Sequence, residues 1–243
     1  MKLLTSLLGI CFTAILVAFN PSGNSEFEGS FTYVIKTQKP DKVESSKTVK
    51  NVMNFYIKDG KTFIKNQRED TDYSFSMLIQ EASDKFYILM DRNGRKIAMK
   101  QDLTSVEKMN SKHSDNTQAN FTKTNRTKTI DGYHCTLYNV NLPDYKGDAW
   151  VTQELNLESA FQSVSSIMKQ HPQSSGESST LKATNLPEDG VVIKSTLEAK
   201  NGSEKIETHM KSISQGKVDQ SKFDISQYRV MDLSGSGGSS FGN

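Results

Sequence analysis

Residues 53–64 read MNFYIKDGKTFI and carry the pattern of a β-hairpin. Met53, Phe55 and Ile57 alternate with Asn54, Tyr56 and Lys58, which is the two-residue period of a strand with one buried face. Asp59-Gly60 follows, and Asx-Gly pairs accept the positive φ angles of the tight turns that join antiparallel strands. This segment therefore predicts two antiparallel strands with one dry and one wet face.

The same arrangement recurs along the chain. Three further Asx-Gly pairs stand between apolar or alternating segments, at Asn93-Gly94, Asp131-Gly132 and Asn201-Gly202. More strands are expected at Phe27–Lys36, Phe75–Gln80 and Ala149–Leu155, which brings the total to about ten or eleven. The pattern predicts a mainly β fold, an antiparallel sheet of about ten strands that can curl.

Two helices are predicted to cover this sheet. The long one spans Leu157–Gln170, where the apolar side chains fall on one stripe, and it ends before His171-Pro172 because proline cannot continue a helix. The short one spans Thr104–Met109, where Thr104-Ser105-Val106-Glu107 has the form of a capping box.

The first 25 residues have the parts of an export signal. Lys2 gives an early positive charge, an apolar run continues to Phe19, and small and turn-forming residues lead to Ser25. A signal-anchor helix is the alternative interpretation, because the run is just long enough to span a bilayer. The expected organisation is a signal peptide at 1–25, one β domain at 26–233 and a disordered Gly/Ser tail at 234–243.

The two cysteines have different expected fates. Lipid anchoring through Cys11 is not expected, because Ile10 stands where a lipidation signal needs a small residue and the apolar run continues beyond it. Removal of the signal leaves only Cys135, so no internal disulfide can form. Cys135 alternates with Tyr133 and Leu137, which predicts a buried, unreactive thiol.

Composition excludes some classes of function. The 243 residues contain 30 Lys and Arg against 28 Asp and Glu, with no basic cluster, so nucleic-acid binding is not expected. Roughly 38% of the residues belong to the usual apolar set, below the typical 45–50%. A one-layer sheet with one wet face needs fewer apolar residues than a sandwich, which agrees with this shortage.

Motifs for chemistry are missing from the sequence. The four histidines occur singly and no cysteine pair exists, so no metal or cofactor is expected. The sequence contains no Gly-x-Ser-x-Gly elbow and no glycine-rich phosphate loop, so no enzyme is expected. An uncharacterised hydrolase remains an alternative, since a carboxylate pair assembled from distant strands leaves no local motif.

The predicted sheet and the long amphipathic helix both have apolar faces that could bind a ligand. A curved sheet under an amphipathic helix can leave a cleft that suits an acyl chain or another hydrophobic small molecule. The candidate lining residues are Met53, Phe55, Ile57, Phe75, Met77, Ile79, Trp150, Phe161, Val164 and Met168. The alternative is that these side chains fill a closed core, in which case the protein is an envelope module that binds a protein partner or has a structural role.

Three segments together point to a family. Residues 127–135, 148–152 and 212–228 resemble a family of exported bacterial proteins of unknown function related to the LolA/LolB lipoprotein-carrier superfamily. The resemblance implies a half-open, strongly curved antiparallel sheet, a half-barrel, closed by helices. It also implies residence in the periplasm or cell envelope and carriage of lipid or lipoprotein acyl chains. It implies no catalytic residues.

Overall fold

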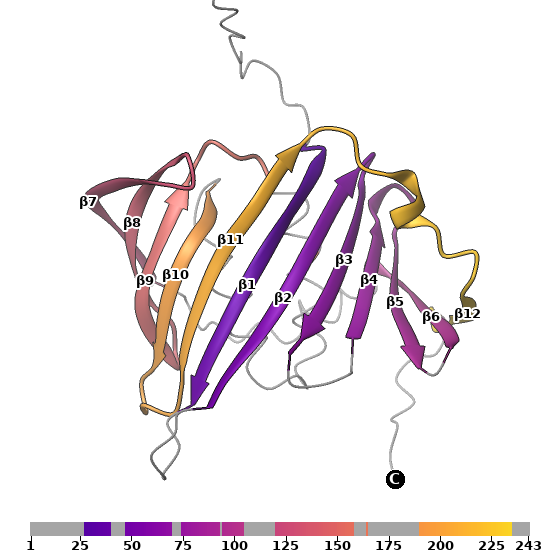
Figure 1. Cartoon of the computed structure of the whole chain (residues 1–243), viewed down its shortest axis with the longest axis horizontal. Helices are drawn as coiled ribbons and strands as arrows, with labels where there is room; N and C mark the ends of the chain where they lie inside the picture. The colour runs from indigo at the N-terminus through magenta and orange to yellow at the C-terminus, as the bar shows by residue number, and fades with distance from the viewer. Residues whose placement is uncertain are drawn as a thin grey trace, which may run out of the picture.

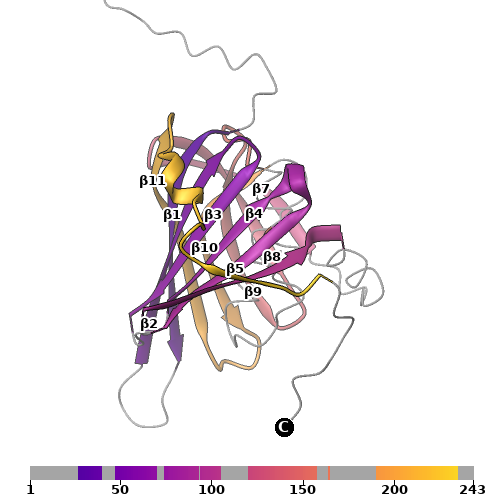
Figure 2. The same cartoon turned by 90° about the vertical axis from the view of Figure 1, so that its right-hand side faces the viewer.

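The fold is seen in a computed structural model that describes residues 27–39, 47–69, 74–92, 94–104, 120–157, 164 and 190–234. Twelve strands in these residues form one sheet in the order β12-β6-β5-β4-β3-β2-β1-β11-β10-β9-β8-β7. Figures 1 and 2 show a single, strongly curved layer, and its end strands β12 and β7 do not pair with each other. The predicted mainly β, open and curved sheet is therefore confirmed.

The elements follow the predicted hairpins closely. Their bounds are β1 Gly29–Lys39, β2 Lys47–Lys58, β3 Lys61–Arg68, β4 Ser74–Gln80, η1 Glu81–Ser83, β5 Lys85–Arg92, β6 Arg95–Asp102, β7 Asn120–Ile130, β8 Tyr133–Asn141, β9 Tyr145–Thr152, β10 Val191–Ala199, β11 Lys205–Gln215, η2 Gln220–Phe223 and β12 Arg229–Asp232. Eleven of the strands pair in one antiparallel sheet, whereas β12 joins β6 in parallel.

The tight turns have the backbone conformation that their residues favour. Asp59 and Gly60 have φ angles of 49° and 63°, and the turn at Asp131 and Gly132 has φ angles of 49° and 89°. Positive values at both positions are those of the two-residue turn whose twist matches the flanking strands. The hairpin at Asn201-Gly202 has a longer connection, because β10 ends at Ala199 and β11 begins at Lys205.

The predicted strand count needs correction, and the predicted helices fall outside the described residues. The sheet has twelve strands instead of about ten, because Arg229–Asp232, which has no alternating pattern, adds to the edge as β12. Of the two predicted helices, only Leu157, Val164 and Thr104 are among the described residues, and so the helices themselves lie outside them. The same holds for the signal peptide and for the tail beyond Ser234. Within the described ranges, no helix is long and apolar enough to cross a membrane.

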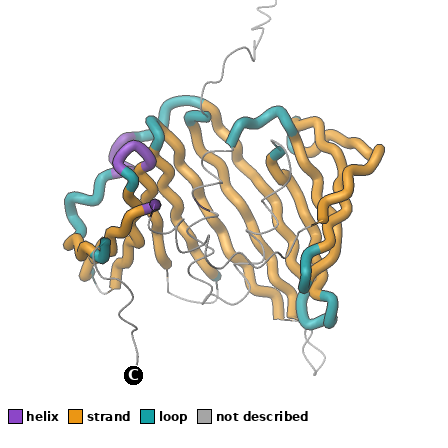
Figure 3. The backbone as a smooth tube through the Cα atoms, turned by 180° about the vertical axis from the view of Figure 1, so that it is seen from behind, coloured by secondary structure: helices purple, strands orange, loops and turns teal. Residues whose placement is uncertain are grey.

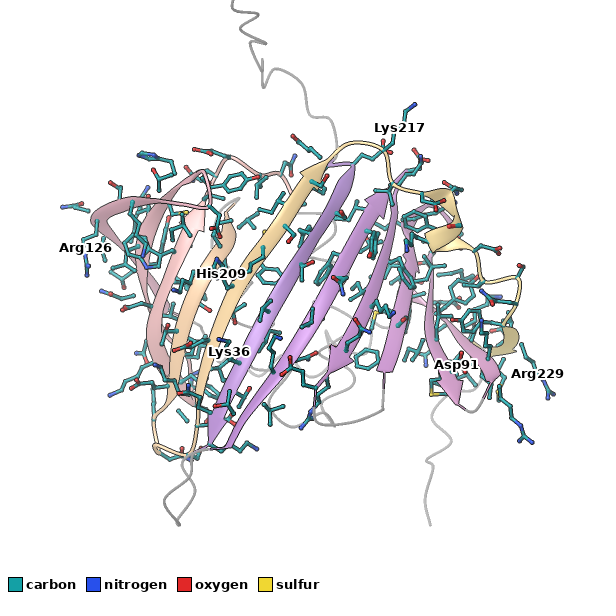
Figure 4. All side chains as sticks on the ribbon, viewed as in Figure 1. Lys36, Asp91, Arg126, His209, Lys217 and Arg229 are labelled. Carbon is teal, nitrogen blue, oxygen red and sulfur yellow. The ribbon has the colours of Figure 1, made fainter. Side chains whose placement is uncertain are left out.

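The strand register defines two faces. We call the face that carries Phe31, Met53 and Phe55 the inner face, and the opposite face the outer face. Phe31 lies opposite Phe55 on β2, and Phe55 lies opposite Ile64 on β3, so large apolar residues meet from strand to strand. Figure 3 shows the inner side, and Figure 4 shows the polar residues Lys36 and His209 on the outer side of the central strands.

The outer face is not wet throughout, which corrects the prediction of one dry and one wet face. At the β3–β6 end, Leu78, Leu89 and Ala98 are buried together with Val218 and Phe223. The covering residues belong to the C-terminal segment around η2, which Figure 2 shows crossing this end of the sheet. The segment Phe86-Tyr87-Ile88-Leu89-Met90 is apolar on both faces because both faces are covered.

Candidate functional site

The inner face carries the largest buried cluster. It combines Phe27, which precedes β1, and side chains from β1 to β5, β8, β10 and β11 with three from the connection between β9 and β10. Its buried members are Phe27, Phe31, Tyr33, Ile35, Met53, Phe55, Ile57, Ile64, Met77, Ile79, Phe86, Cys135, Leu155, Leu157, Val164, Val191, Ile193, Ile206 and Met210. We call this set the inner cluster. None of its members is more than 8% exposed, so water does not reach this surface.

Aromatic rings form the centre of the inner cluster. Phe31 and Phe55 are stacked, with ring centroids 4.6 Å apart and an interplanar angle of 13°. Tyr33 meets both rings edge-on, at 5.8 Å from Phe31 and 6.0 Å from Phe55. Such pairs add about 0.5–1.5 kcal/mol each beyond the burial of their area. This part of the sheet is therefore a rigid apolar platform.

Most of the predicted lining residues meet in this cluster. Met53, Phe55, Ile57, Met77, Ile79 and Val164 are all members of it. Phe75 is half-buried, and the register places it between Asn66 and Met90 on the inner face. Phe161 and Met168 lie outside the described residues, so their prediction stays open.

Trp150, another predicted lining residue, packs at the edge of the inner cluster. It packs against the inner cluster as a partly buried neighbour, and the Lys128 ammonium lies 3.9 Å from its ring centroid. In the register it lies opposite Lys194 on β10 and Leu137 on β8, next to the irregularity between Val192 and Lys194. Trp150 therefore lies at the border of the inner cluster, in contact with it.

The connection between β9 and β10 supplies part of the described cover of the inner cluster. Leu155, Leu157 and Val164 follow β9, and they are 5%, 2% and 1% exposed within the cluster. A one-layer sheet has to bury its apolar face against another part of the chain. The connection between β9 and β10 supplies such contacts here.

Several buried residues on the inner face are polar. Asn66 continues the row of Ile64 on β3, and Thr208 stands between Ile206 and Met210 on β11. They are 4% and 3% exposed, and within the described part of the chain Oδ1 of Asn66 and Oγ1 of Thr208 have no hydrogen-bond partner. Asn51, on β2, is also buried, at 5%. Buried polar atoms are normally paired, so the two without partners require an explanation.

Tyr33 shows the usual solution for a buried polar group. Its hydroxyl donates a hydrogen bond of 2.7 Å to the carbonyl oxygen of Val192 across the inner face. Burial raises the pKa of the Tyr33 phenol far above its ordinary value, because the charged form would lose its hydration. Tyr33 is therefore a neutral donor and has no role as a base.

Cys135 and His209 are the other groups on the sheet that could be reactive. Cys135 is fully buried, as predicted, and burial raises the pKa of its thiol, so the thiolate form is disfavoured. His209 Nε2 lies 2.6 Å from Oδ2 of Asp131 on the outer face, which makes a surface pair. In the described ranges, no group of three His, Cys, Asp or Glu side chains could hold a metal ion.

Sequence comparison identifies the family. Residues 28–227 match the family described as "Domain of unknown function (DUF4412)". The chain belongs to the DUF4412 family. This confirms the expected membership of a family of unknown function. No curated protein matches this DUF4412 chain.

Some solved structures are similar to the DUF4412 chain in outline. Mycobacterium tuberculosis lipoprotein LppX is 11% identical, with 79% of this chain and 89% of that chain covered and a TM-score of 0.38. A LolA superfamily protein from Nitrosomonas europaea is 7% identical, with 82% and 90% covered and a TM-score of 0.33. PNGF-II is 14% identical, with 85% of this chain but 31% of that chain covered and a TM-score of 0.37, so this chain spans under a third of its length. These low TM-scores carry no argument about the DUF4412 chain's function.

Sequence reasoning missed two groups at this site. Phe31, Tyr33 and Ile35 alternate with Thr32, Val34 and Lys36, and this pattern could have marked them as inner residues. Asn66 and Thr208 interrupt apolar alternation at positions that face inward. A polar residue in such a position is a detectable signal, but whether it lacks a partner depends on the neighbouring strands.

Proposed function

We propose that the protein is a non-enzymatic binding protein of the bacterial cell envelope that shelters a hydrophobic ligand, a lipid or a lipoprotein acyl chain, on the inner face of its sheet. The observation that carries the proposal is the inner cluster, a largely apolar surface on one layer of sheet, which the connection between β9 and β10 helps to cover. An acyl chain gains about 0.8 kcal/mol for each buried CH₂ group, so this surface can hold one by apolar contact alone.

Export supports the proposed location. The segment 1–25 has the charged start, apolar run and small-residue exit of a signal peptide. We place the mature protein in the periplasm or envelope, where a partner protein would deliver or receive the ligand. The absence of an enzymatic role is part of the proposal, and it is supported by the raised pKa values of the Tyr33 phenol and the Cys135 thiol.

A closed core is the second candidate. It is favoured by the exposure of at most 8% throughout the inner cluster, which means that the surface is already covered without a ligand. In that case the protein would act through its surface or its edge strands. The two candidates differ in one property, namely whether the cover can yield to an acyl chain while the sheet stays folded.

Ligand content tests the proposal directly. The mature protein would be purified, extracted with organic solvent and analysed by mass spectrometry, and binding of a dansylated undecanoic acid would be titrated by fluorescence. We expect a co-purified lipid or saturable probe binding. No extracted lipid together with no probe binding would refute the carrier.

A pair of variants separates the two candidates. Val164→Asp introduces a charge where the cover meets the inner cluster, and Val230→Asp introduces the same charge on β12, where the side chain is 48% exposed. A carrier should lose probe binding in Val164→Asp but keep its β-sheet circular dichroism, while Val230→Asp should bind normally. Unfolding of Val164→Asp alone would instead support the closed core.

A further inference from the structure

Two unpaired polar atoms on an apolar surface suggest what kind of ligand the inner face accepts. Oδ1 of Asn66 and Oγ1 of Thr208 are buried and lack hydrogen-bond partners in the described residues. Burying a polar group without a partner costs free energy, whereas an apolar residue of similar size would cost nothing of this kind. A ligand that supplied the missing partners would remove that cost.

The positions of these residues form a stripe across the strands. The register connects Asn51 on β2 with Ile35 on β1 and with Thr208 on β11, and Thr208 lies opposite Ser195 on β10. Asn66 on β3 lies opposite Met53, two residues along β2 from Asn51. The buried polar residues Asn66, Asn51, Thr208 and Ser195 thus follow one line across the strands from β3 to β10, which the apolar Ile35 interrupts on β1. We call them the polar stripe.

The stripe borders the aromatic platform. Tyr33 and Phe31 follow Ile35 in the inward row of β1, and Met53 and Phe55 follow Asn51 in that of β2. On β1 and β2 the platform lies to one side of the stripe, whereas on β11 apolar residues flank Thr208 on both sides, Met210 towards the platform and Ile206 beyond it. An amphiphile that lay along β1 and β2 would place its chain on the platform and its headgroup at the stripe.

The chemistry of the atoms selects among headgroups. An amide oxygen such as Oδ1 of Asn66 accepts hydrogen bonds only, so its partner must be an O–H or N–H donor. A threonine hydroxyl can both donate and accept. Asn66 and Thr208 are three strands apart, roughly 14 Å at the usual strand spacing, so one small polar group cannot reach both.

We infer that the ligand is a lipid with several hydroxyl or amide donors spread over its headgroup, as in a glycolipid, and that Asn66 and Thr208 bind this headgroup. The inference rests on the proposed function, because it concerns the ligand of the same inner face. No reaction is involved, and the ligand is held by apolar contact along its chain and by hydrogen bonds at its head.

Two detergents with the same chain test the inference. Dodecyl maltoside offers many hydroxyl donors, whereas octaethylene glycol monododecyl ether offers mostly ether oxygens, which only accept. Binding of each would be measured by displacement of the dansylated undecanoic acid below the critical micelle concentration. The wild-type protein should prefer the maltoside by about tenfold, the ratio that one or two net hydrogen bonds provide.

Variants assign this preference to the stripe. Asn66→Leu and Thr208→Val should each reduce the preference at least threefold, mainly by weakening maltoside binding. Thr62→Val is the matched control, because Thr62 is 3% exposed on the same face of β3 but lies opposite Ile57 and Ile79, outside the stripe. It should leave the preference unchanged. Thermal unfolding should show that all three variants are folded.

Each result has a distinct meaning. Equal binding of both detergents by the wild-type protein, or an unchanged preference in Asn66→Leu and Thr208→Val, would overturn the headgroup inference and leave the proposed function standing. A loss of preference in Thr62→Val as large as in Thr208→Val would also overturn it. Binding of neither detergent and no binding of the probe would refute the proposed function itself.

Discussion

Tyr33→Phe should weaken the sheet in a way that depends on pH. The change removes the hydroxyl that donates to the carbonyl oxygen of Val192 over 2.7 Å, and that carbonyl then loses a buried partner. Such a loss costs about 1–3 kcal/mol in the free energy of unfolding at neutral pH. For a chain of this size, the melting temperature should fall by about 2–12 °C.

The pH dependence follows from the raised pKa of the Tyr33 phenol. The folded state keeps the phenol protonated, whereas the unfolded chain releases the proton near pH 10. The wild-type protein therefore has the full contribution of this residue below pH 10 and loses about 1.4 kcal/mol of stability by pH 11. The Tyr33→Phe protein has no phenol proton to release at this position. Its deficit in the free energy of unfolding, relative to the wild-type protein, should therefore be about 1.4 kcal/mol smaller at pH 11.

Urea denaturation at pH 8 and pH 11, followed by circular dichroism, measures both quantities. Phe31→Leu is the control, because it weakens the same aromatic group without removing a titratable group, and its cost should be equal at both pH values. A Tyr33→Phe protein whose stability deficit is the same at pH 8 and pH 11 would show that the phenol is not buried as described.

Three other predictions test separate parts of the structure, one by thiol labelling and two by substitution. Cys135 should react with Ellman's reagent only on unfolding, because its thiol is buried and its pKa is raised; rapid reaction of the folded protein at pH 8 would contradict this. Gly147→Ala should destabilise the protein by about 1–3 kcal/mol, because a Cβ atom would lie 2.0 Å from the carbonyl oxygen of Thr196, and an unchanged urea midpoint would show that β9 and β10 are less close. The Lys100 ammonium lowers the pKa of the Asp232 carboxyl, so this ion pair stabilises β12 above about pH 4 and is lost at more acidic pH. Asp232→Asn should accelerate amide exchange in β12 at pH 7, with unchanged exchange in β1 as the internal control.

The hairpins could be predicted because their information is local. Asp59-Gly60 and Asp131-Gly132 have the positive φ angles that their residue types favour, and the alternation of Met53, Phe55 and Ile57 correctly assigned their inner face. The strand at Arg229–Asp232 could not be found in this way. Its pairing depends on contacts with β6, more than 120 residues earlier in the chain, and on the ion pair between Lys100 and Asp232.

For a similar reason, the candidate site could be predicted only in part from the sequence. Alternation shows which residues share a face within a strand, and it correctly grouped Met77 and Ile79 with Met53. Alternation cannot show which residues of β9 share a face with those of β2, because this depends on the register of every strand pair between them. The β9–β10 pairing shifts between Val192 and Lys194, next to Trp150, so alternation along β9 alone does not assign the face of Trp150. No local pattern indicates this irregularity.

A dry inner cluster does not by itself argue against a carrier. An empty carrier that left such a cluster open would present an apolar surface of the kind that drives aggregation, so its unloaded form has to be covered. The informative residues are those that a purely structural core would not retain. Asn66 and Thr208 lower the stability of the covered form, since their oxygen atoms have no partner in the described residues. If Asn66→Leu makes the ligand-free protein more stable and weakens its binding of dodecyl maltoside, then this stability was given up for recognition. A variant that is more stable and binds equally well would leave the polar stripe without a role in binding.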